Sequence, residues 1–108
     1  MNIGQITKMA QQMQTQMVQA QEELKQTTLE ASAGGGAVRV VITGAQEVRS
    51  VEIDPSAVDP SEVEMLQDLV MTAINEAIAR SKELERERMA GIAGGMGLPG
   101  MPGLPGFG

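Results

Sequence analysis

The chain has 108 residues, enough for one domain of ordinary size, and its formal net charge is −6. It contains no cysteine and no histidine, which excludes disulfides, thiol nucleophiles, zinc–thiolate sites and imidazole acid–base chemistry. The negative charge by itself disfavours nucleic acid as a partner, because long-range repulsion opposes the approach to phosphate, but it does not describe local patches.

The hydrophobic residues indicate a thin, aliphatic core. There is one phenylalanine, no tryptophan or tyrosine, and nine methionines. A small domain with such a core gains from pairing with a second copy. No apolar run approaches the ~20 residues of a membrane helix. No basic segment followed by an apolar stretch opens the sequence, so we expect a cytoplasmic protein without a membrane partner.

Residues 2–26 are predicted to form a helix. Apolar side chains recur along it at spacings of three and four, and one set also fits a heptad seam: Ala10, Met13, Met17, Ala20 and Leu24. The other faces are rich in glutamine, with Lys8 and Lys25 as the cations. Core or coiled-coil packing explains the methionines best, and a ligand groove is the alternative.

Two strands are predicted over residues 37–43 and 47–54, joined by a three-residue hairpin connection at 44–46. Residues 27–33 fit either a short, weak strand or a frayed helix end. Strict alternation places Val38 and Val40 on one face of the first long strand, with Val41 on the other. In the second long strand it places Val48 opposite to Val51 and Ile53.

Residues 60–90 are predicted to form a second long helix. Asp59 is positioned to cap it, Pro60 suits its first turn, and its acidic residues precede its basic ones, as the helix dipole favours. Residues 91–108 are rich in glycine and proline and are expected to form a flexible tail. The alternative is that its Leu-Pro-Gly repeats dock on a partner protein through Met, Leu and Phe107.

The glycines Gly34–Gly36 raise the possibility of a phosphate loop. Such a loop follows a strand and opens onto a helix, whereas these glycines lead into a strand and lack a Gly-Lys-Ser/Thr sequence. We therefore interpret them as a turn. Asp54 and Asp59 are a possible carboxylate pair, but each also fits the end or start of an element. No serine has a histidine to activate it, so we expect no catalytic residues, cofactor or metal.

In this order, the elements resemble the YbaB/EbfC family of bacterial nucleoid-associated DNA-binding proteins. The resemblance covers nearly the whole chain and is strongest in "GGGAVRVVITGAQEVRSVEIDP" (34–55) and "EMLQDLVMTAINEAIARSKE" (64–83). It implies an α+β fold: an α-β-β-β-α protomer over residues 1–90, with a small antiparallel sheet between two long helices and residues 27–33 as the first strand. It also implies a homodimer with projecting helices that binds duplex DNA with little sequence preference and helps to organise or protect the nucleoid.

The residues of this chain suit a dimer, because a small sheet is marginal alone and its second face is expected to carry Val41, Val51 and Ile53. We take these three as the candidate dimer interface. Two departures from the family stand out: a first helix with few cations, and a Pro-Gly tail that is longer than usual.

A local basic patch is our hypothesis for how an acidic chain holds DNA. The candidate DNA-binding residues are Lys8, Lys25, Arg80, Lys82, Arg86 and Arg88, with Arg39 and Arg49 as possible additional contacts. Glutamines can add uncharged hydrogen bonds to phosphate or sugar. The competing interpretation is that these cations only pair with nearby glutamates at helical spacing. The rival function is a protein-interaction adaptor that uses the Met/Gln-rich helix and the tail.

Overall fold

The computed structural model describes residues 2–95. The elements follow in the order α1 (Ile3–Gln26), β1 (Thr28–Ala33), β2 (Val38–Thr43), β3 (Val48–Ile53), the short 3₁₀ turns η1 (Pro55–Ala57) and η2 (Pro60–Glu62), and α2 (Val63–Gly95). The strands form one antiparallel sheet in the order β1-β2-β3. The α-β-β-β-α order is therefore confirmed, and residues 28–33 are a strand rather than a helix end.

The second long helix differs from the prediction at both ends. Asp59 caps η2, and α-helical structure begins at Val63 rather than near Pro60. At the other end α2 continues to Gly95, so residues 91–95 of the expected tail are helical. Glycine lowers helix stability by about 1 kcal/mol per residue relative to alanine, but it does not forbid the conformation. The rest of the tail, residues 96–108, lies outside the described part of the chain.

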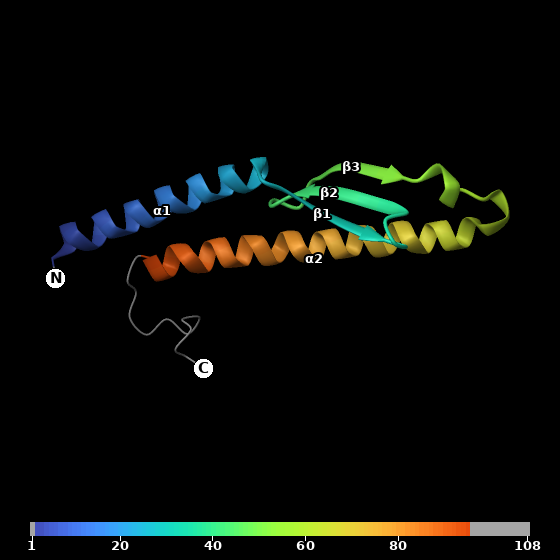
Figure 1. Ribbon diagram of the computed structural model, residues 1–108. Helices are drawn as coiled ribbons and strands as arrows, with labels where there is room; N and C mark the ends of the chain where they lie inside the picture. Colours follow the sequence, from blue (N-terminus) through green and yellow to red (C-terminus); the bar gives the residue numbers. More distant parts are fainter. Residues whose placement is uncertain (1, 96–108) are drawn as a thin grey trace, which may run out of the picture.

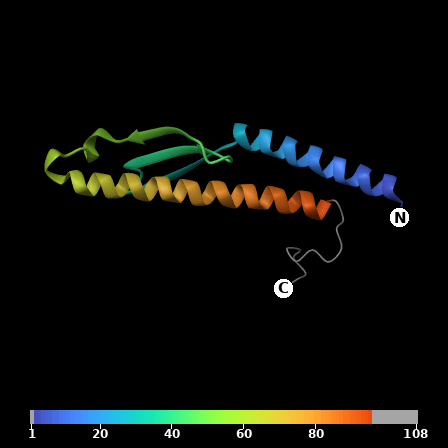
Figure 2. The same ribbon diagram turned by 180° about the vertical axis from the view of Figure 1, so that it is seen from behind.

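The core forms where β1 and β2 pack on α2. Val38, Val40 and Ile42 of β2 are fully buried, and they meet a line of small residues on the helix, Ala73 and Ala77, which are also fully buried. Small side chains on the helix let the sheet approach closely. Figures 1 and 2 show α2 running along the length of the sheet and continuing far beyond it.

α1 does not cover the sheet; it runs antiparallel to the C-terminal half of α2. Only its last turns are firmly anchored, through the buried residues Ala20 and Leu24. An ion pair of 3.0 Å between Glu23 and Arg88 also links the two helices. In both views the N-terminal end of α1 extends past the end of α2 (Figures 1 and 2). The molecule is consequently elongated, measuring 70 × 30 × 15 Å.

A β-bulge changes which side chains share a face of β3. The pairing Val40↔Val51 is regular, but the register shifts so that Ile42 faces Val48. Directly opposed residues project from the same face of a sheet. Val48, Val51 and Ile53 therefore all lie on the face that packs on α2, and the prediction that Val48 lies opposite to Val51 is wrong. Strict alternation does not hold because the bulge adds a residue to β3.

Val41 lies on the other face of the sheet from Val51 and Ile53. Its partner is Ser50, and it is half-buried. The expectation that Val41, Val51 and Ile53 share one exposed face is thus corrected, because the strand register, which alternation within each strand does not specify, puts Val51 opposite Val40.

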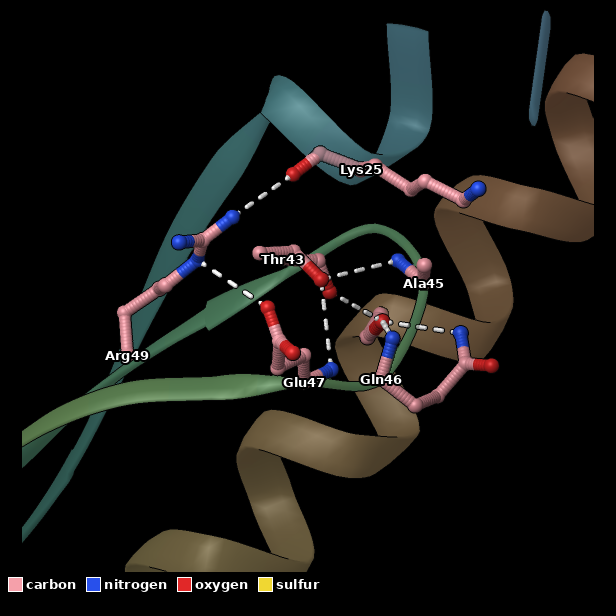
Figure 3. Close-up of polar contacts among 7 residues, drawn as sticks. Lys25, Thr43, Ala45, Gln46, Glu47 and Arg49 are labelled. Atoms are coloured by element: carbon pink, nitrogen blue, oxygen red, sulfur yellow. Dashed lines mark hydrogen bonds and ion pairs between the residues drawn. The ribbon is translucent and has the colours of Figure 1, made fainter. Parts of the chain in front are cut away.

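A buried polar network locks the β2–β3 hairpin onto α2. The fully buried Ser81 hydroxyl donates to the carbonyl oxygen of Thr43 at 2.6 Å and accepts hydrogen bonds from the backbone and side-chain nitrogens of Gln46. The Thr43 hydroxyl in turn accepts from the amides of Ala45 and Glu47 (Figure 3). Gln46 adopts the left-handed conformation, with φ of 61°, that this tight connection needs.

Gly44, the first residue of that hairpin connection, touches the end of α1. Its amide donates to the carbonyl oxygens of Leu24 and Thr27, both at 2.9 Å. A Cβ at this position would lie 2.6 Å from Leu24 Cδ2 and 3.1 Å from the Leu24 carbonyl oxygen. Only glycine allows the helix end to pack this closely on the sheet.

We predict that Gly44→Ala lowers the free energy of unfolding by about 1–3 kcal/mol, the usual range for overpacking a tight contact. Gly91→Ala is the control, since a Cβ there meets nothing within 4 Å and alanine favours helix; it should raise stability by about 0.5–1 kcal/mol. Urea denaturation of both variants measures the two changes. If Gly44→Ala instead raises the free energy of unfolding as Gly91→Ala does, the contact between α1 and the hairpin is not tight in solution.

Candidate nucleic-acid interface

Charge is strongly segregated along the chain. Residues 50–79 hold seven of the fourteen acidic residues and none of the eight basic ones, so this block has a charge of −7. The remainder of the chain therefore has seven acidic and eight basic residues, a charge of +1. The acidic block covers β3, the 3₁₀ turns and the first half of α2, at the end of the molecule opposite to the N-terminus (Figure 1). The excess negative charge is thus confined to one end.

Two predicted cations, Lys82 and Arg86, lie one turn apart on the solvent face of α2. At 3.6 residues per turn they point away from the buried face made by Ala73, Ala77 and Ser81, and both are exposed. Lys82 has no ion-pair partner among residues 2–95. Because both side chains are exposed, this face is the most accessible positive surface of the helix.

Arg86 forms a forked contact with Glu83, with hydrogen bonds of 2.6 and 3.2 Å. These hydrogen bonds lower the pKa of the Glu83 carboxyl and raise the pKa of the Arg86 guanidinium. Both side chains are at least half exposed, and exposed pairs of this kind contribute little to stability. The guanidinium can therefore exchange the glutamate for a phosphate at small cost.

Arg80 and Arg88 are engaged within the fold. Arg80 donates to the carbonyl oxygen of Glu30 on β1 at 2.8 Å and pairs with Glu76 at 3.0 Å. Arg88 reaches across to Glu23 of α1. Arg80 is thus held at the sheet and Arg88 at α1, while Lys82 and Arg86 lie on the solvent face, so the four predicted cations of this helix do not form one patch.

The two lysines of α1 are far apart. Lys25 follows Lys8 by seventeen positions, about 25 Å along a helix. Lys25 pairs with Glu22 at 3.2 Å, whereas Lys8 has no ion-pair partner in the described part of the chain. From Met9 to Gln21 the helix α1 carries no charged side chain, and its exposed face presents amide and hydroxyl groups of Gln11, Gln14, Thr15 and Gln19.

The possible additional contacts, Arg39 and Arg49, are both held by acidic or backbone groups. Arg39 lies on the outer sheet face between Glu30 and Glu52, at 3.7 and 3.1 Å. Arg49, at the bulge, pairs with Glu47 and donates to the Lys25 carbonyl oxygen at 3.2 Å, which satisfies a free acceptor at the end of α1 (Figure 3).

The two aspartates considered as a carboxylate pair act as caps. Asp54 accepts hydrogen bonds from the amide and hydroxyl of Ser56, and Asp59 does the same with Ser61. These bonds lower the pKa of both carboxyls. No cluster of three potential metal ligands occurs among residues 2–95, and no helix in that range is long and apolar enough to cross a membrane.

An exposed apolar surface borders the acidic end. Val48, Val51 and Ile53 are 41%, 43% and 38% exposed although they lie on the core face of the sheet, because α2 covers β1 and β2 only. A shallow apolar groove runs along the first half of α2, lined chiefly by Leu66, Val70, Met71 and Ile74.

The groove faces the β3 side of α2. Arg80 reaches β1 and Ser81 reaches the β2–β3 hairpin, so the next positions round the helix, where Ile74 and Met71 lie, point toward β3. Sequence reasoning placed Val51 and Ile53 on an exposed face, but it missed Val48 and the groove of α2, because no residue pattern signals the bulge or the strand order. It also missed the Ser81 network, since a serine in a helix carries no signal of its partner.

Comparison with known proteins agrees with this architecture. The profile of the YbaB/EbfC DNA-binding family matches residues 1–96. A nucleoid-associated protein of Acetivibrio thermocellus is 50% identical over 95 residues, which cover 88% of this chain and 84% of the relative. One from Chloroflexus aurantiacus is 51% identical over 96 residues, covering 89% and 96%.

The fold has a solved counterpart. The crystal structure of an uncharacterized protein from Helicobacter pylori, HP0035, superposes with a TM-score of 0.76 and 25% identity, covering 86% of this chain and 98% of that protein. Sequence match, element order and solved counterpart agree, and the chain belongs to the YbaB/EbfC DNA-binding family.

Proposed function

We propose that this protein binds duplex DNA as a homodimer with little sequence preference and acts in the nucleoid, helping to organise or protect the DNA. The segregation of charge carries the proposal. A chain with a net charge of −6 can approach a polyanion if its acidic block stays at the far end. The family description and the names of the relatives support DNA binding in the nucleoid.

The DNA-contacting surface in this proposal is the arm formed by α1 and the second half of α2. Lys82, Arg86 and Lys8 supply accessible cations, and Lys25 and Arg88 add charge near the base of the arm. The glutamine face of α1 supplies uncharged donors for phosphate and sugar oxygens. Such contacts position a protein on the duplex without reading bases, which favours binding with little sequence preference.

The uncovered side of the sheet supports a homodimer. β3 is an edge strand with Val48, Val51 and Ile53 exposed beside the groove of Leu66, Val70, Met71 and Ile74. A second copy that packs on this surface removes the apolar side chains from water and protects the strand edge. We therefore place Val51 and Ile53 in the interface and leave Val41, on the other sheet face, outside it.

This dimer would double the number of phosphate contacts. The interface lies in the sheet half of a molecule 70 Å long, so the two arms would project from the joined sheets. Each arm alone offers few accessible cations, and linking two weak sites raises the overall affinity through effective concentration.

We predict that the double variant Lys82→Gln/Arg86→Gln weakens duplex binding for all sequences alike. Each phosphate contact that is lost should lower the slope of log K against log salt by about 1. Fluorescence titration of a labelled duplex at several salt concentrations measures both quantities. Arg80 and Arg88 are left unchanged, because they also hold the fold together.

The matched control is Glu64→Gln/Asp68→Asn. These residues precede Lys82 and Arg86 by 18 positions, five full turns, and so lie on the same helix face at the acidic end. If the arm binds DNA, this control changes affinity little although it reduces the net negative charge by two. Suppose that Glu64→Gln/Asp68→Asn strengthens binding by as much as Lys82→Gln/Arg86→Gln weakens it. The overall charge of the protein, and not the arm, would then govern binding.

We further predict that Val51→Lys converts the dimer to a monomer while the helix content stays native, because a lysine would be buried against the second copy. Val58→Lys, at an apolar residue of similar exposure (53% against 43%) between η1 and η2, should leave the dimer intact. Sedimentation equilibrium distinguishes the two. A dimeric Val51→Lys protein would place the interface elsewhere.

A further inference from the structure

The apolar seam of α1 continues beyond the part that α2 covers. The heptad positions Leu24, Ala20, Met17 and Met13 are followed toward the N-terminus by Ala10, Ile6 and Ile3. Leu24 and Ala20 are buried and Met13 is half-buried, but Ile6 and Ile3 are 51% and 80% exposed. The same stripe that anchors the helix at its base thus has no cover at its tip.

The apolar stripe of α1 becomes exposed at the point where α2, which packs on it, ends. Gln16 of α1 borders the same surface hollow as Arg88, Gly91 and Ile92 of α2, and α2 reaches only three residues past Ile92. Residues 2–12 are all exposed. About 15 Å of helix, from Ile3 to Met13, therefore extends past the covered region.

The chain that follows α2 has the chemistry to cover this stripe. Residues 96–108 carry no charge, and apolar side chains recur at every third position: Leu98, Met101, Leu104 and Phe107. In a polyproline II conformation every third side chain lies on the same side, at intervals of about 9 Å. The α1 seam repeats once per heptad, about every 10.5 Å, so the two spacings are nearly commensurate.

Length and entropy also favour this occupant. The thirteen residues after Gly95 span about 40 Å as polyproline II, more than the exposed stripe requires. Prolines restrict the free chain, so less conformational entropy is lost when it docks. Up to Gln21, Lys8 is the one charged side chain of α1, so no charged group has to be desolvated along the seam.

We propose that the segment Leu98–Phe107 docks back on α1 of the same chain, along the exposed seam Ile3–Ile6–Met13, and takes over the cover where α2 ends. The segment runs toward the N-terminus of α1, since α2 delivers it near Met13, and its last residues lie beside Ile3. The contact is between two uncharged apolar surfaces and leaves Lys8 and the glutamine face free.

The absence of native cysteines makes a site-specific test possible in the full chain. A nitroxide on Gly108→Cys should selectively reduce the amide NMR signals of Ile3–Met9 and spare those of the first half of α2. Ile6→Gln should abolish this loss. Val18→Gln is the matched control, since Val18 is also 51% exposed but lies off the seam, and the loss should persist.

Two results would overturn the proposal. The first is no selective loss, or the same loss in Ile6→Gln and Val18→Gln, which would leave the seam uncovered by the tail. The second is a loss that appears when isotope-labelled chains without nitroxide are mixed with nitroxide-bearing unlabelled chains, because the occupant would then be the tail of a second copy. Circular dichroism of both glutamine variants verifies that α1 remains helical.

Discussion

The contact of β1 and β2 with the alanine line of α2 is the interaction on which the rest of the molecule depends. Ala73 and Ala77 bring the sheet so close that Val38, Val40 and Ile42 are completely buried. One helix covers two strands at this distance, and β3 is left with its core face exposed. The Ser81 network then fixes the hairpin on the same helix, so sheet position and helix rotation are set together.

This packing also determines which charges are accessible. With Ala73, Ala77 and Ser81 turned inward, the opposite face of α2 presents Glu64 and Asp68 at one end and Lys82 and Arg86 at the other. The helix is longer than the sheet, so its basic half leaves the core and joins α1 in an arm (Figure 1). In the proposed function, this single helix thus carries the dimer surface at one end and the DNA surface at the other.

The sequence predicts the elements well because their local signals agree. Periodicity marks both helices, and β-branched residues and a glycine connection mark β2 and β3. Asp59 and Pro60 are capping signals, but they open η2 instead of the long helix that they are predicted to start. The helical run to Gly95 was not predicted, because glycine-rich composition outweighed the local continuity of the helix.

The candidate site was less predictable because it depends on contacts between distant residues. Six cations were grouped from charge alone, but Arg80 is drawn to a β1 carbonyl and Arg88 to α1. Neither partner is visible from helical spacing. Likewise Val48 and Val41 exchange their expected faces relative to Val51 because a bulge and the strand register intervene. The rotation of α2 and the register of β3 are set by tertiary packing. They determine which of the predicted cations and apolar residues are exposed and available for binding.

The most direct test of the central claim is a titration of labelled mixed-sequence duplexes with the purified full chain at low and moderate salt. We expect binding that weakens steeply with salt and is nearly equal for unrelated sequences, as contact between a local basic surface and phosphates requires. Absence of binding even at low salt would contradict the account and favour a protein-interaction role. Binding that salt does not affect would contradict the phosphate contacts that the arm is proposed to make.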